Sequence, residues 1–290
     1  MSRDTMILDL DDDDTTPTDN VDVMAELAAA LGATRLTVVD WGAATSQGMR
    51  RRVNEDAWGS RGELFVVADG MGGRGGGALA ARTAVDRILA RASTPPATTD
   101  WRSVVTAVND DVVQAGVARG IERLGTTLLA AAVGGPLVTL VHLGDSRAYR
   151  LTRAPDRAAP ARLDAGQLDL LTHDHNVRSE LLAAGLDVRE YRDRGVALHG
   201  LTSFIGLEHE TLRIDVLAVP VRAGDRLLLC TDGVHRQLDD DQIRRELAAE
   251  TSHQAAERLV ERSDRAGGRD NATALVLHLD VTPGDDRDHR

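Results

Sequence analysis

Four apolar segments of this sequence each end or begin beside an aspartate that is flanked by glycine or a small polar residue. They are LFVVADGMGG with Asp69, LVHLGDSR with Asp145, LLLCTDGV with Asp232 and GGRDNAT with Asp270. The end of a strand holds a side chain rigidly, and a neighbouring glycine lets backbone and ligand approach closely. One such aspartate is an ordinary turn residue, but four of them favour a shared site. Carboxylates brought together there would repel each other unless a cation lay between them.

The order of the predicted elements indicates an α+β fold. Apolar runs predict strands, and apolar residues three and four apart predict helices. The strands come in groups separated by paired helices, which favours a layered α/β/β/α sandwich with two mainly antiparallel sheets flanked by helix pairs. The predicted strands are 34–42, 63–70, 126–133, 137–144, 146–151, 211–219, 226–233 and 271–280, and the predicted helices are 81–92, 101–112, 177–186 and a pair within 239–265. Residues 153–167 and 187–200 are interpreted as polar loops.

Composition divides the chain into a catalytic domain and two charged tails. Residues 1–33 contain an acidic tract and are expected to be disordered, residues 34–281 form the domain, and residues 282–290 form a charged tail. The net charge is −12, and all 34 basic residues are arginines, so clustered lysine and arginine for nucleic acid is not expected. A lone cysteine, Cys230, and the lack of a long apolar run predict a cytoplasmic protein that does not insert into a membrane.

The carboxylate oxygens of these aspartates predict that a hard divalent cation binds there. Carboxylates suit Mg²⁺ or Mn²⁺, and the sequence has no H-E-x-x-H or C-x-x-C pattern typical of zinc. Two such ions could together activate water and hold a phosphoryl group. Upstream, Arg51 precedes the acidic pair Glu55 and Asp56, and a guanidinium suits a phosphate dianion because it donates in bidentate fashion.

The motifs taken together resemble the metal-dependent protein phosphatase family, type 2C (PPM), in its bacterial form. RRVNED, VVADGMGG, GTTL, HLGDSRAY, LTHDHN, LLCTDGV and GGRDNATALV occur in the family's order over about residues 34–281. The resemblance implies a protein serine/threonine phosphatase whose binuclear metal centre activates water for direct hydrolysis of phosphoserine and phosphothreonine. It implies two Mn²⁺ or Mg²⁺ ions with a third, weaker site. Its partners would be phosphorylated proteins, among them bacterial Ser/Thr kinases and their substrates.

The resemblance also assigns roles to individual residues. Asp69 would bridge two metals, the Gly70 carbonyl would face metal, and Asp232 and Asp270 would complete the ligands of one ion. Asp145 would hold the third ion together with Asp232. The remaining assignments are Arg51 for the substrate phosphate, Glu55 and Asp56 for metal-bound waters, Thr126 near the water network and Asn271 as the residue that orients Asp270.

The resemblance leaves the proton donor for the leaving group open. Some relatives carry a histidine directly after the Asp-Gly pair, whereas this chain has Met71, which cannot donate a proton. A metal-bound water is the first candidate, and His175 in THDHN is the second. A loop histidine that is hydrogen-bonded to backbone is the simpler interpretation of His175.

Two other functions compete with phosphatase activity. A phosphoprotein-binding pseudophosphatase would have lost at least one metal aspartate, and none is missing here. MILDLDDD near the N-terminus resembles the haloacid dehalogenase motif, with Asp9 as nucleophile and Asp11 as acid/base. That motif lacks its usual threonine, since Asp13 stands there, and the chain has no lysine to complete it.

Overall fold

The computed structural model describes residues 8–9, 35–73, 75–93, 99–135, 137–152 and 166–282 of the 290-residue chain. Most of the predicted tail 1–33, all but the first residue of the C-terminal tail and most of the predicted loop 153–167 lie outside these ranges. The proposed division into tails and domain therefore stays a prediction. Within the described ranges, no helix combines the length and the apolar character needed to cross a membrane.

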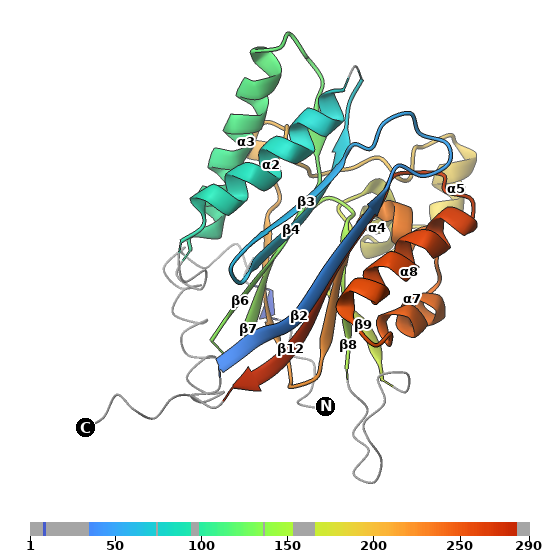
Figure 1. The fold of residues 1–290 in the computed structure, drawn as a ribbon. Helices are drawn as coiled ribbons and strands as arrows, with labels where there is room; N and C mark the ends of the chain where they lie inside the picture. The colour runs from blue at the N-terminus through green and yellow to red at the C-terminus, as the bar shows by residue number, and fades with distance from the viewer. Residues whose placement is uncertain are drawn as a thin grey trace.

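Two antiparallel sheets form the centre of the molecule (Figure 1). The first sheet has seven strands in the order β1-β10-β7-β6-β4-β3, with β5 paired to β4, and the second has five in the order β2-β12-β11-β8-β9. The strands of the first sheet are β1 (Leu8–Asp9), β3 (Asp56–Arg61), β4 (Leu64–Met71), β5 (Gly125–Thr126), β6 (Leu128–Gly134), β7 (Leu137–Leu143) and β10 (Asp215–Pro220). Those of the second are β2 (Arg35–Ser46), β8 (Arg147–Leu151), β9 (Leu168–Leu170), β11 (Arg226–Cys230) and β12 (Ala272–Thr282).

Helix pairs cover the outer faces of both sheets. Figure 1 shows α2 and α3 on one side of the sandwich and α7 and α8 on the other. The helices are α2 (Gly76–Arg91), α3 (Trp101–Val117), α4 (Val177–Ala183), α5 (Val188–Asp193), α6 (Asp232–His235), α7 (Asp240–Leu247) and α8 (Ser252–Arg265), with a 3₁₀ turn, η3, at His209–Thr211. The predicted α/β/β/α sandwich is therefore confirmed.

Alternation along the strands explains the layers, because successive side chains of a strand point to opposite faces. In β4, Val66 packs toward α2 and α3, whereas Phe65 and Val67 pack between the sheets. In β11, Leu229 likewise lies between the sheets, and Leu228 packs beneath α7 and α8. Strands covered on both faces read as continuous apolar runs, and these runs made them recognisable in the sequence.

The helices begin at polar capping residues. Asp239 and Gln242 form a reciprocal capping box at the start of α7, and Thr251 accepts the Gln254 N–H at the start of α8. Asp100 caps α3 in the same way through the Ser103 N–H. Such caps bind N–H groups that have no partner within the helix.

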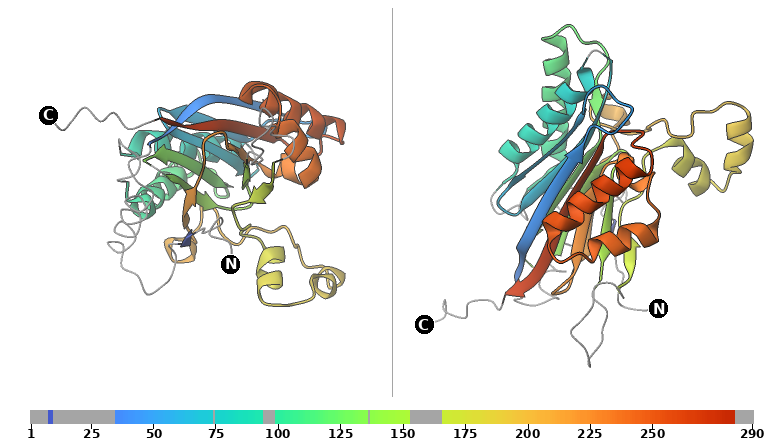
Figure 2. Two further views of the ribbon diagram at one scale, coloured as in Figure 1. Left: turned by 90° about the horizontal axis from the view of Figure 1, so that it is seen from below. Right: turned by 45° about the vertical axis from the view of Figure 1, so that its right-hand side comes forward.

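Six short elements were not predicted from the sequence. They are β1, β3, β9, α5, α6 and η3. Of these, β1 lies in the segment 1–33 that was expected to be disordered, and it pairs with β10. The interpretation of 187–200 as a polar loop was wrong for α5, which lies within it and buries none of its residues. Without a buried face, α5 has no apolar periodicity to reveal it. Figure 2 shows the α4–α5 segment as a projection beside the sandwich.

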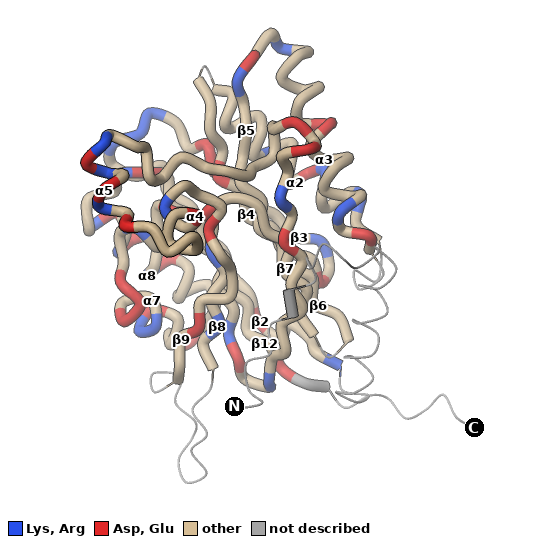
Figure 3. The backbone as a smooth tube through the Cα atoms, turned by 180° about the vertical axis from the view of Figure 1, so that it is seen from behind, with Lys and Arg blue, Asp and Glu red and all other residues tan. Residues whose placement is uncertain are grey.

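Charge is distributed by layer. The strands β6 and β7 have no charged Asp, Glu or Arg and are tan throughout in Figure 3, while α5 carries both colours. Among the aspartates at the strand ends, Asp145 and Asp232 are buried, while Asp69 and Asp270 are partly exposed.

Candidate active site

Strand ends from both sheets surround one cavity of about 310 Å³. Asp69 lies near the end of β4 in the first sheet, and Asp232 begins α6, one residue after β11 of the second sheet ends. Asp270 precedes β12, and Asp145 lies in the turn between β7 and β8. The cavity is lined by eight of the ten residues that the sequence assigned to a site: Arg51, Glu55, Asp69, Gly70, Asp145, Asp232, Asp270 and Asn271.

The other two predicted residues lie behind the cavity wall. Thr126 is fully buried, and its hydroxyl donates to the Asp69 carbonyl at 2.9 Å. Asp56 pairs with Asp69 across β3 and β4, and its Oδ2 accepts from Thr231 and Thr273 at 2.8 and 2.7 Å. Both residues thus support the aspartates instead of lining the cavity.

The backbone at Asp69 is fixed by a neighbouring strand. Its N–H donates to the Thr127 hydroxyl and its carbonyl accepts the Thr127 N–H, both at 2.9 Å. Directly after it, Gly70 has no room for a side chain, because a Cβ there would collide with the Gly77 carbonyl and come within 2.5 Å of the Glu55 carbonyl. The glycine is therefore required by close backbone packing around the carboxylate.

Asn271 ties three segments together. Its backbone N–H donates to Asp270 Oδ1 at 2.9 Å, and its side-chain oxygen accepts the Glu55 N–H at 2.9 Å. Its amide nitrogen donates to the carbonyls of Gln47 and Val53, both at 2.9 Å. The loop that carries Arg51 and Glu55 is thereby held against the start of β12.

Electrostatic repulsion marks the cavity as a cation site. Burial, followed by the charges of Asp56, Asp232 and Asp145, raises the pKa of Asp69 well above its usual range. Burial and then Asp232 raise the pKa of Asp145 to about 6, although Arg236 opposes this shift. Carboxylates that raise one another's pKa in this way are stabilised as anions by a cation, and their oxygens suit Mg²⁺ or Mn²⁺.

Arginines bind the outer carboxylate oxygens. Arg51 Nη2 lies 2.5 Å from Asp270 Oδ2, with half of the Arg51 side chain exposed. Arg236 lies between Asp145 and Asp232, at 2.5 Å from Oδ2 of the first and 2.6 Å from Oδ2 of the second. The pair of carboxylates expected to hold a third ion is thus already bound by a guanidinium.

His175 is not placed to donate a proton in the cavity. It is fully buried, its Nδ1 accepts the Gly144 N–H at 3.3 Å, and its Nε2 lies 2.9 Å from Asp215 Oδ2. The structural interpretation of this histidine, bound to backbone, agrees with these contacts. The histidine that lines the cavity is His199, which sequence reasoning did not select.

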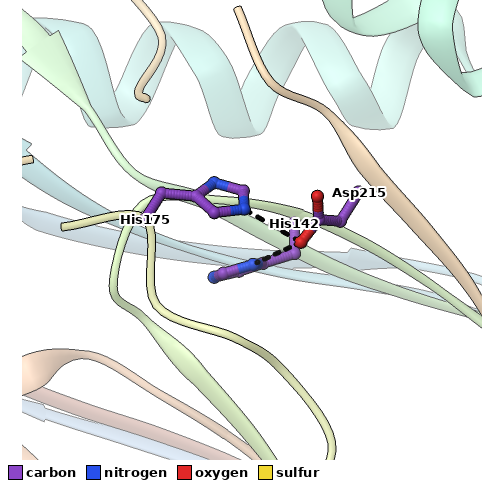
Figure 4. Close-up of side chains that lie close together, drawn as sticks. All are labelled: His142, His175 and Asp215. Carbon is purple, nitrogen blue, oxygen red and sulfur yellow. Dashed lines mark hydrogen bonds and ion pairs between the residues drawn. The ribbon is translucent and has the colours of Figure 1, made fainter. Parts of the chain in front are cut away.

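His175 belongs to a buried cluster with His142 and Asp215 (Figure 4). Their ligand-type atoms lie within 4.8 Å of one another, which raises the question of a metal. Because the Gly144 N–H occupies Nδ1 of His175, the proton lies on Nε2 and is donated to Asp215. A metal at Nε2 would require the opposite tautomer. The hydrogen bonds from Gly144 to His175 and from His175 to Asp215 therefore support the turn that carries Asp145. Neither ring nitrogen of His142 has a hydrogen-bond partner among the described residues.

Thr127 and Arg236 line the cavity but were also missed. Arg236 stands four residues after Asp232, a spacing that places two side chains on the same helical face, so a local signal existed. Thr127 follows Thr126 in GTTL, and only the tertiary structure shows which of the two threonines lines the cavity.

Known proteins are similar to this chain in sequence and in fold. The sequence profile of the family described as "Protein phosphatase 2C" matches residues 45–265. The serine/threonine phosphatase stp of Listeria monocytogenes is 30% identical over 82% of this chain and 95% of its own length. The serine/threonine protein phosphatase PstP of Mycobacterium tuberculosis is 29% identical, and the match spans 83% of this chain but 45% of PstP.

A solved structure extends the likeness to three dimensions. The catalytic domain of PstP, crystallised in complex with two manganese ions, superposes with a TM-score of 0.69 at 29% identity, covering 86% of this chain and 100% of that one. Sequence profile, relatives and fold agree with the arrangement of aspartates around one cavity. This chain therefore belongs to the protein phosphatase 2C family of metal-dependent serine/threonine protein phosphatases.

Proposed function

We propose that this chain removes phosphate from phosphoserine and phosphothreonine of other proteins at the cavity formed by Asp69, Asp232 and Asp270. The observation that carries the proposal is the convergence of these carboxylates from both sheets, with Arg51 beside them. Carboxylates that are at least partly buried and repel one another, with a guanidinium beside them, form a site for cations and a phosphate dianion.

Asp69, the Gly70 carbonyl, Asp232 and Asp270 are proposed to hold two divalent ions, Mn²⁺ or Mg²⁺. The fit rests on their oxygen atoms and on the raised pKa of Asp69 and Asp232, which burial raises first in both cases. The two manganese ions of the PstP structure support this choice. Bound there, such ions supply an activated water and neutralise charge on the phosphoryl group.

The protein's own residues orient the reaction. Arg51 is half exposed at the cavity, so its guanidinium can donate to a phosphate oxygen while Asp270 keeps it in place. Thr126 and Thr127 fix the backbone of Asp69, and Asn271 fixes the loop of Arg51 and Glu55. Direct hydrolysis needs no nucleophilic side chain, and Cys230 is no candidate, because burial raises the pKa of its thiol to about 12.

The proposed partners are phosphorylated proteins, among them Ser/Thr kinases and the proteins that they phosphorylate. Two observations support this: the listerial and mycobacterial relatives are named serine/threonine phosphatases, and the net charge of −12 does not favour nucleic acid. A cytoplasmic location stays a prediction from the single cysteine.

The first test is phosphate release from a phosphothreonine peptide with and without Mn²⁺. We expect turnover that requires the metal and falls at least about a hundredfold in Asp232→Asn, equivalent to roughly 3 kcal/mol of barrier. Asp241→Asn is the matched control, because that carboxylate is 76% exposed on α7 and should leave the rate unchanged. A wild-type protein that binds the peptide but releases no phosphate with either Mn²⁺ or Mg²⁺ would indicate a phosphoprotein-binding module instead.

A further inference from the structure

Arg236 is a positive charge that the chain itself places within the carboxylate cluster. One guanidinium nitrogen binds Asp145 Oδ2 and the other binds Asp232 Oδ2, so a single side chain bridges the turn after β7 and the start of α6. The two carboxylates are only 5% and 12% exposed, whereas Arg236 is 33% exposed. Ion pairs with buried partners are screened little by solvent or salt.

The backbone around Arg236 holds this bridge in place. Its N–H donates to the Asp232 carbonyl at 2.9 Å. Because Arg236 lies four residues after Asp232, about one helical turn, its side chain also lies beside the Asp232 carboxylate. The preceding residue, His235, contacts the Asp145 carbonyl through Nε2 at 2.8 Å. A carbonyl oxygen can only accept, so the Nε2–H of His235 donates to it. Two consecutive residues therefore bind the backbone and the side chain of Asp145.

A guanidinium in this position competes with a metal ion for the same oxygens. Arginine stays protonated at every pH that a protein tolerates, so it does not leave by losing its proton. A divalent ion bound to both Oδ2 atoms would have to displace it or lie beside a like charge. Arg51 binds one carboxylate, Asp270, and is half exposed, whereas Arg236 bridges both Asp145 and Asp232. The pair Asp145 and Asp232 therefore does not fit a third divalent ion while Arg236 lies between them.

We propose that Arg236 takes the place of a third divalent ion: it binds Asp145 and Asp232 permanently, and the centre accepts two ions. The inference rests on the proposed function for the two-ion centre, but it concerns Asp145, which is not a ligand of that centre, together with Asp232, which both sites share. It makes this site different from one in which Asp145 and Asp232 are free to bind a cation. The side chain of Arg236, at the C-terminal end of α6, then sets the number of bound ions.

The test counts Mn²⁺ ions bound to the full chain, using equilibrium dialysis with metal analysis. We expect two ions in wild type and three in Arg236→Asn, with the third weaker than the others. Arg213→Gln is the matched control. Arg213 also binds two carboxylates, the buried Asp215 and the exposed Glu180, but it does not line the cavity. It should still bind two ions.

Asp145→Asn provides a readout that does not depend on how Arg236→Asn folds. We expect Asp145→Asn to bind two ions. The double variant, which combines Asp145→Asn with Arg236→Asn, should also bind two ions, without the third ion that Arg236→Asn alone gains. A third ion in wild type that disappears in Asp145→Asn would overturn the proposal, and so would a folded Arg236→Asn with two ions. Failure of wild type to bind any Mn²⁺ would instead contradict the two-ion centre itself, and with it the proposed function.

Discussion

At the scale of single residues, Asp56 is a buried carboxylate that is hydrogen-bonded at one oxygen only. Thr231 and Thr273 both donate to Oδ2, and Oδ1 has no hydrogen-bond partner among the described residues. Burial raises the pKa of Asp56 to about 7 from 3.8, with the two threonine hydrogen bonds opposing the shift and Asp232 adding to it. The folded, metal-free protein therefore keeps a proton that the unfolded chain releases.

This proton makes the stability of the metal-free protein depend on pH. Because the pKa of Asp56 is higher in the folded state, its contribution is fully present below about pH 4 and is lost as the pH rises toward 7. We expect the free energy of unfolding in EDTA to fall between about pH 4 and about pH 7, and to fall less in Asp56→Asn. Urea denaturation across this range measures it.

The exposed Asp241→Asn should follow the wild-type pH dependence in the same series. If Asp56→Asn lost stability with rising pH as steeply as wild type, Asp56 would not hold the proton. Added Mn²⁺ should flatten the wild-type curve, because a cation stabilises the ionised carboxylates.

At the scale of elements, two close contacts between helix and strand leave no room for a methyl group. At Gly233 in α6, a Cβ would collide with the Asn271 carbonyl beside β12. At Gly42 in β2, it would collide with the backbone of His253 in α8. The contact of Gly233 lies at the cavity, because Asn271 lines it, and the contact of Gly42 does not. A comparison of alanine variants at the two glycines therefore distinguishes an effect on metal binding from a general effect of overpacking on stability.

We expect Gly233→Ala and Gly42→Ala each to lower stability by about 1–3 kcal/mol through overpacking. Only Gly233→Ala should also weaken Mn²⁺ binding, because it displaces Asn271 and the neighbouring Asp270 relative to Asp232. Thermal unfolding and Mn²⁺ titration of both variants measure these effects. Equal Mn²⁺ affinity in the two variants would show that the α6–β12 contact does not position the metal ligands.

At the scale of the whole molecule, the packing of the two sheets decides whether the site exists. Asp69 comes from the first sheet, and Asp232 and Asp270 flank strands of the second. Between the sheets lies a core that includes Phe65, Leu140 and the fully buried Leu277 of β12. The proposed cation site is thus a product of sheet packing, and cation binding should be coupled to stability.

We expect Leu277→Ala to lower the free energy of unfolding by about 2–5 kcal/mol, as for other buried leucines. Mn²⁺ at about a hundred times its dissociation constant should add about 2.7 kcal/mol to wild type and a similar amount to Leu277→Ala. Asp270→Asn should lose most of that increment. Urea denaturation with and without Mn²⁺ gives all the values, and an increment that survives in Asp270→Asn would place the ions elsewhere.

The sequence by itself determined the layers and the identity of the aspartates. Strands such as β4 and β11 read as apolar runs because both of their faces are buried, and α2 and α3 show helical periodicity because one face is buried. These signals are local, since they depend on the spacing of neighbouring residues. The aspartates at strand ends were recognisable for the same reason. By contrast, α5 buries no residue and left no pattern to find.

Only the tertiary structure decided which charged groups meet. Arg236 and Asp145 are 91 residues apart, and the Glu55 N–H meets the Asn271 side chain across 216 residues. Such contacts depend on how the two sheets pack, and no local sequence pattern shows that residues so far apart in the chain meet. The sequence therefore identified the carboxylates of the proposed cation site. The packing of the two sheets placed one pair of them, Asp145 and Asp232, on a single arginine, Arg236.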